Sequence, residues 1–105
     1  MRNELAGKLE LIGEVFEIDG MTELLGKFDA KMKPVKFSAV VIQIESLIIK
    51  EAPKTADKLV AMKLGITEEE TENLDDAEYT NALKDAIIGD VLGFFASSPR
   101  TDGQK

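Results

Sequence analysis

The side chains in this sequence that could do chemistry are carboxylates, lysines and a single tyrosine. The 105 residues include 20 acidic and 13 basic side chains but no His and no Cys. The absence of His removes the commonest general base and the commonest metal ligand. The absence of Cys removes disulfides, thiol nucleophiles and thiolate metal sites. We therefore expect a protein that is not an enzyme and that binds no cofactor and no metal.

The densest group of candidate ligands is the acidic segment at residues 67–78. It lacks the alternating Asp/Asn pattern with a central Gly that a calcium-binding loop requires. Thr67 with Glu70, and Asp75 with Glu78, instead have the spacing of capping boxes at two helix starts. We interpret the segment as capping groups on a solvated surface, comprising Glu68, Glu69, Glu70, Glu72, Asp75, Asp76 and Glu78.

Asp90 is the other carboxylate that needs an explanation, because it stands among apolar residues near the end of the chain. A carboxylate is rarely buried without a partner. Nothing beside Asp90 in the sequence resembles a second catalytic group. We expect it either at the rim of the core or paired with a lysine of another helix.

The most apolar element that must position these groups is a long final helix at residues 77–97, which Pro99 ends. A strip of small residues runs beside its apolar face, suited either to close packing within the chain or to a partner helix from the same or another protein. The apolar run is shorter than the about 20 residues of a membrane span. The apolar face holds Leu83, Ile87, Val91, Phe94 and Phe95, and the small strip holds Ala82, Ala86, Gly89 and Gly93.

Apolar periodicity predicts four further helices, at residues 4–18, 22–33, 35–51 and 54–64. Asp19-Gly20 is also a hairpin signal, so a short hairpin near residues 14–25 remains an alternative. With 44% hydrophobic and 31% charged residues, the composition is that of a globular domain. The sequence therefore predicts an all-α, single-domain bundle of about five helices over residues 1–97. Residues 98–105 are expected to form a disordered C-terminal tail.

The helix expected at residues 35–51 carries a second apolar stripe on its back, formed by Ile42 and Ile49 one heptad apart. This stripe is either a core contact with a further helix or an exposed association surface. The candidate protein-binding residues are Ile42, Ile49, Ala82, Ala86, Gly89, Gly93, Phe94 and Phe95.

The charge distribution restricts the kinds of partner. The net charge is −7, and residues 67–105 hold 10 acidic and 3 basic side chains. This distribution argues against binding nucleic acid through a basic surface. Residues 1–8 are mixed and charged, without the apolar core of a signal peptide. We expect a cytoplasmic protein with a protein partner, and association with a second copy remains open.

Residues 59–104 read LVAMKLGITEEETENLDDAEYTNALKDAIIGDVLGFFASSPRTDGQ. This helix, acidic connector, apolar final helix and Ser-Pro tail resemble the small tail assembly chaperones of long-tailed bacteriophages and prophages of Gram-positive hosts. The resemblance covers a little under half of the chain. It implies a non-catalytic protein of the bacterial host cytoplasm that coats the helical tape measure protein and recruits tail tube subunits. It supplies no catalytic residues.

A small acidic regulatory module is the alternative function, either a phage-encoded inhibitor or a nucleic-acid mimic. Such a mimic should spread its carboxylates along one face. In this chain the carboxylates gather at residues 67–78, which counts against the mimic.

Overall fold

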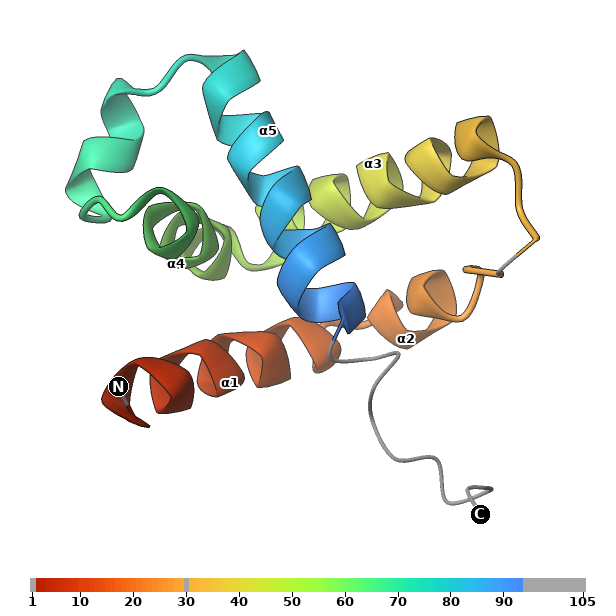
Figure 1. The fold of residues 1–105 in the computed structure, drawn as a ribbon, viewed down its shortest axis with the longest axis horizontal. Helices are drawn as coiled ribbons and strands as arrows, with labels where there is room; N and C mark the ends of the chain where they lie inside the picture. Colours follow the sequence, from red (N-terminus) through yellow and green to blue (C-terminus); the bar gives the residue numbers. More distant parts are fainter. Residues whose placement is uncertain (1, 30, 94–105) are drawn as a thin grey trace.

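The computed structural model describes residues 2–29 and 31–93, and every regular element in these ranges is helical (Figure 1). The all-α prediction is therefore confirmed. The predicted tail at residues 98–105 lies outside the described residues, as do Phe94 and Phe95. The elements are α1 (Arg2–Phe16), α2 (Met21–Leu25), α3 (Pro34–Glu51), α4 (Pro53–Leu64), the 3-10 helix η1 (Glu69–Asn73), α5 (Asp76–Ala86) and the π-helical turn η2 (Ile87–Val91).

The connection between α1 and α2 settles the hairpin alternative. Gly20 has a φ of 87°, in the left-handed region that glycine adopts without steric cost. The backbone N–H of Met21 donates to the carbonyl of Ile18 at 3.0 Å, closing a turn between two helices. Asp19-Gly20 therefore joins helix to helix in the described chain, and the hairpin at residues 14–25 is not formed.

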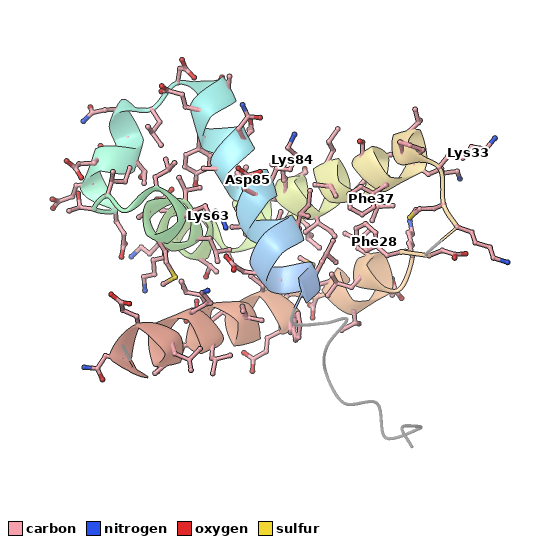
Figure 2. All side chains as sticks on the ribbon, viewed as in Figure 1. Phe28, Lys33, Phe37, Lys63, Lys84 and Asp85 are labelled. Atoms are coloured by element: carbon pink, nitrogen blue, oxygen red, sulfur yellow. The ribbon has the colours of Figure 1, made fainter. Side chains whose placement is uncertain are left out.

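The second predicted helix is wrong in length, since α2 covers Met21–Leu25 and not residues 22–33. Gly26 follows its last residue, and glycine costs about 1 kcal/mol against alanine inside a helix. Beyond Gly26 a tertiary contact replaces the helix: the ring of Phe28 packs on that of Phe37, with centroids 5.1 Å apart (Figure 2). The contact holds this connection against the start of α3.

Prolines begin both α3 and α4, at Pro34 and Pro53. The first helical position tolerates proline because its missing N–H would have no intrahelical partner. Gly65 ends α4 with a φ of 70°, the left-handed C-cap conformation that glycine favours. The β-branched run of α3 is helical because a 3.6-residue period gathers its core residues on one face. The buried members are Val40, Val41, Ile44 and Ile48.

Both predicted capping boxes are present. The N–H of Glu70 donates to Thr67 Oγ1 at 3.1 Å, and the N–H of Thr67 donates to Glu70 Oε1 at 2.9 Å. At the start of α5, the N–H of Glu78 donates to Asp75 Oδ1 at 2.8 Å, and Glu78 Oε1 accepts from the N–H of Asp75 at 3.0 Å. Part of the acidic segment thus serves to begin η1 and α5.

The core lies where α5 crosses α3 and α4 and its continuation η2 reaches α1 (Figure 1). Leu83, Ile87 and Val91 are fully buried there, as their predicted apolar face required. Burying each such side chain stabilises the fold by roughly 1.5–3 kcal/mol. Among residues 2–29 and 31–93, this crossing leaves Ile42 and Ile49 of α3 exposed.

Candidate protein-binding groove between α3 and α5

An exposed apolar stripe runs along the uncovered side of α3. Val35, Ile42 and Ile49 follow one another at heptad spacing and are 80%, 61% and 40% exposed. The stripe extends over about 21 Å of helix at 1.5 Å per residue. The Ile42/Ile49 pair is therefore surface and not core, which favours the association-surface interpretation. Sequence reasoning missed Val35, although its heptad spacing from Ile42 was a usable signal.

A groove lies between this stripe and α5. It consists of two adjoining hollows of about 370 and 400 Å³, which share Ile42, Glu45 and Thr80. Lys84 stands on the α5 side of the groove (Figure 2). We call this feature the α3–α5 groove, and its floor includes Glu45. Its apolar lining is Phe37, Val41, Ile42, Ile49 and Ile88.

Glu45 is the unexpected residue of the α3–α5 groove. Its side chain is only 8% exposed, and its Oε2 has no hydrogen-bond partner in the described part of the protein. Burial raises the pKa of Glu45, and the positive charge of Lys84 partly opposes this shift. The Thr80 hydroxyl does not satisfy the carboxylate, because it donates to the carbonyl of Asp76 at 2.8 Å.

A buried carboxylate oxygen without a hydrogen-bond partner is costly and is the kind of exception that calls for an explanation. Sequence reasoning missed Glu45 because only apolar residues were sought on the back of the helix. The positional signal was available: Ile42, Glu45 and Ile49 stand at i, i+3 and i+7 and so share one side of α3.

The predicted strip of small residues does not form one open surface. Ala82 and Ala86 are 4% and 1% exposed and lie within the core, where they serve packing of the chain itself. A Cβ at Gly89 would lie 3.4 Å from Lys63 Nζ, whereas a Cβ at Gly93 would meet nothing within 4 Å in the described structure. The strip is therefore divided between an internal contact and the surface.

A second groove lies between α1 and α4. Its two hollows, of about 430 and 670 Å³, share Gly7, Ala61, Met62 and Ile66. We call it the α1–α4 groove; Leu5 and Met62 stand at its exposed edge. Glu14 lines this groove and accepts a hydrogen bond from Thr55 Oγ1 at 2.7 Å.

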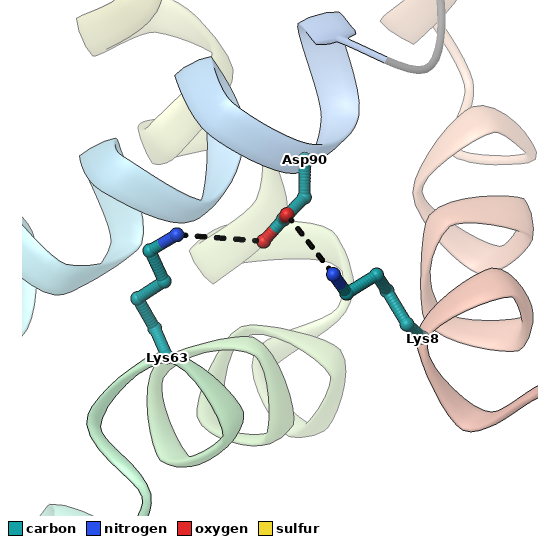
Figure 3. Close-up of polar contacts among 3 residues, drawn as sticks. All are labelled: Lys8, Lys63 and Asp90. Atoms are coloured by element: carbon teal, nitrogen blue, oxygen red, sulfur yellow. Dashed lines mark ion pairs between the residues drawn. The ribbon is translucent and has the colours of Figure 1, made fainter. Parts of the chain in front are cut away.

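Asp90 joins this region to η2. Its Oδ1 lies 3.4 Å from Lys8 Nζ of α1, and its Oδ2 lies 3.8 Å from Lys63 Nζ of α4 (Figure 3). The expected pairing with a lysine of another helix is confirmed. The π-helical turn, closed by the N–H of Leu92 donating to the carbonyl of Ile87, carries Asp90 at this junction. Asp90 therefore links three helical elements through charge.

Tyr79 is also held in a structural contact. Its hydroxyl donates to Asp57 Oδ1 at 2.6 Å. Burial, together with the hydrogen bond and charge of Asp57, raises the pKa of Tyr79 well above its ordinary value. The phenol stays protonated at neutral pH and ties α5 to α4.

Residues 2–29 and 31–93 contain no group of three or more acidic side chains placed to hold a metal ion. Over the same ranges, no helix combines the length and the apolar character needed to cross a membrane. Comparisons with protein-family models, with curated proteins and with solved structures found no match to this chain.

Proposed function

We propose that this chain is a non-catalytic assembly factor that binds helical segments of another protein in the α3–α5 groove. The observation that carries the proposal is the exposed stripe of Val35, Ile42 and Ile49 beside that groove. β-Branched residues repeated at one heptad position are typical of helix-pairing seams. Contiguous apolar surface exposed to water marks association sites.

The first candidate partner is a phage tape measure protein, and the tail tube protein is the second. The resemblance of residues 59–104 to tail assembly chaperones supports this choice, since such chaperones coat a long helical protein. Covering an amphipathic helix would remove its apolar stripe from water. The exposed carboxylates of residues 67–78 would help keep the complex dissolved. Such a protein would act in the cytoplasm of the bacterial host.

Co-expression with a phage tape measure protein tests the proposal. We expect the chain to raise the soluble recovery of the tape measure protein. The double variant Ile42→Asp/Ile49→Asp should abolish most of that gain, because it places two charges in the seam. The matched control is Leu5→Asp/Met62→Asp in the α1–α4 groove, whose side chains are comparably exposed and which should keep the gain.

Circular dichroism and thermal melting of both double variants must first show that each is folded. If both double variants lose soluble recovery equally, the result would argue against the α3–α5 groove as the binding surface. A folded protein that neither binds nor solubilises the tape measure protein would overturn the chaperone function. The small acidic regulatory module would then be the better explanation.

A further inference from the structure

An apolar partner surface alone would provide no hydrogen-bond partner for the carboxylate in the floor of the α3–α5 groove. Glu45 lies between Ile42 and Ile49 on the same side of α3, and its Oε2 is buried without a hydrogen-bond partner among the described residues. A wholly apolar helix laid over the stripe would remove the remaining water from this carboxylate and leave it unpaired. Breaking or omitting one half of a buried ion pair is strongly destabilising.

We propose that the α3–α5 groove binds an amphipathic helix that places one basic side chain, Arg or Lys, against Glu45. Glu45 then determines which helices bind, and the flanking isoleucines supply the apolar contact. This inference rests on the helix-binding function proposed above and adds the chemistry of the partner. The partner helix should therefore carry one basic residue between two apolar residues on its contacting face. The basic residue would face Glu45, and the apolar residues would face Ile42 and Ile49.

The energetics of a polar group within an apolar seam favour this assignment. A hydrogen bond between an ionised donor and a carboxylate is roughly twice as strong as one between neutral groups. A single polar residue in a helix-pairing seam selects partner and register at some cost in stability. The arrangement of Ile42, Glu45 and Ile49 has this form. It therefore discriminates among amphipathic helices that would otherwise bind alike.

Lys84 is the nearest competitor for Glu45 within the chain. It lines the same groove, and its charge acts on the carboxylate, but it donates no hydrogen bond to Oε2. Its side chain is exposed, so its ammonium group keeps its hydration where it stands. The carboxylate is therefore available to a side chain that arrives together with an apolar surface.

A second copy of this chain is a poor occupant on electrostatic grounds. Parallel pairing of two α3 stripes would bring the two Glu45 carboxylates to facing positions of the seam, where like charges repel. The chain also carries a net charge of −7. Long-range attraction therefore favours a basic partner over a second acidic copy.

A displayed library of helical peptides tests the inference even while the natural partner is unidentified. Each peptide has fixed apolar seam residues and one randomised seam position between them. When peptides are selected for binding to the wild-type protein, we expect Arg and Lys to be enriched over Leu at that position by about tenfold. This is the ratio that a difference of about 1.4 kcal/mol in binding free energy produces. Selection for binding to the Glu45→Leu variant should show no preference for Arg and Lys. Glu45→Gln serves as a second variant with a smaller structural change.

A selected peptide then permits a double-mutant cycle by fluorescence anisotropy. The Arg→Gln peptide should lose affinity for the wild-type protein and lose much less for Glu45→Gln, because the two changes remove the same contact. Losses that simply add would overturn the inference. Lys84→Gln should leave the preference for Arg in place. If it abolishes the preference, Lys84 and not Glu45 is the determinant.

The remaining outcomes separate this inference from the function on which it rests. If the wild-type protein and Glu45→Leu select the same apolar residue at the randomised position, the role of Glu45 is overturned while helix binding remains intact. Failure to select any peptide whose binding Ile42→Asp/Ile49→Asp abolishes would overturn helix binding itself. A wild-type dimer in sedimentation that the same double variant disperses would assign the groove to a second copy.

Discussion

The α3–α5 groove and the α1–α4 groove expose similar apolar side chains but treat their carboxylates differently. Ile42 is 61% exposed at the first, and Leu5 is 55% exposed at the second. Glu14 in the α1–α4 groove accepts a hydrogen bond from Thr55, whereas Oε2 of Glu45 has no such partner in the described structure. Exposed apolar area alone therefore does not distinguish a binding site from the edge of a core. The satisfaction of the polar groups does.

The two grooves also differ in the stiffness of their apolar residues. Ile42 and Ile49 are β-branched and restricted at χ1, so ordering them on binding costs little entropy. Met62, at the edge of the α1–α4 groove, has an unbranched and adaptable side chain. The α3–α5 groove is therefore the better prepared of the two for a partner with a defined seam.

The largest difference in the free energy of unfolding should be between a substitution on the buried face of α3 and one in its exposed stripe. Ile44 is fully buried and Ile42 is exposed, two residues away on the same helix. Ile44→Ala should cost about 2–5 kcal/mol, through lost transfer free energy and the cavity left behind. Ile42→Ala should change the free energy of unfolding by less than about 0.5 kcal/mol, as surface substitutions do.

Chemical denaturation of the two variants measures this difference. Comparable costs at the two positions would place Ile42 inside the core of the chain. The α3–α5 groove would then offer no free stripe, and the contrast between the grooves would fail.

Replacing the carboxylates of the two grooves, Glu45 and Glu14, should change the free energy of unfolding in opposite directions. Methionine replaces glutamate with a side chain of similar length and good helix propensity. Glu45→Met should stabilise the free protein by about 1 kcal/mol, because an unsatisfied buried polar group is removed. Glu14→Met should destabilise it by about 1 kcal/mol, because the buried Thr55 hydroxyl loses its acceptor. Urea denaturation of both variants at neutral pH checks the signs; a loss of stability in Glu45→Met would indicate a partner within the chain.

The gain in Glu45→Met should also depend on pH. Burial raises the pKa of Glu45, so its protonated form favours the folded state. The resulting contribution to stability is fully present below the unfolded-state pKa and is lost as the pH rises through the folded-state pKa. The advantage of Glu45→Met over the wild type should therefore be largest at neutral pH and shrink in acid. Melting curves across this range measure it, and an advantage that grows in acid would contradict the raised pKa.

The local signals in the sequence predicted much of this fold. The two capping boxes act within a few residues, so their effects do not depend on tertiary packing. The burial of Leu83, Ile87 and Val91 followed from a 3.6-residue period. The predicted length of α2 was wrong because the helix ends before Gly26. Beyond Gly26, Phe28 packs on Phe37, a tertiary contact that helix periodicity does not reveal.

The candidate site was predictable only in part. Ile42 and Ile49 were identified from their spacing, but their exposure depends on where α5 crosses α3. The same crossing buries Glu45 in the floor of the groove, and the sequence position of Glu45 alone does not indicate this burial. For Ala82 and Ala86 the sequence left open close packing within the chain or contact with a partner helix, and both residues are buried in the core. Which apolar surface a helix leaves open is a property of the assembled core.

The smallest effect should come from the junction that links the α1–α4 groove to η2. Asp90 lies near Lys8 and Lys63, but both lysine side chains are more than a third exposed, so water screens the pairs. Exposed ion pairs contribute about 0–1 kcal/mol. Asp90→Asn should therefore cost less than about 1 kcal/mol in low salt, and the difference from wild type should fall further in high salt.

Paired denaturation curves in low and high salt measure the contribution of Asp90. The control is Asp85→Asn, also on the final helical segment but exposed and without an ion pair in the described residues. Its effect should be smaller than that of Asp90→Asn in low salt. A salt-independent loss of several kcal/mol in Asp90→Asn would mean that the π-helical turn depends on this carboxylate. The α1–α4 groove would then be held by a buried polar contact of its own, and the difference between the grooves would narrow.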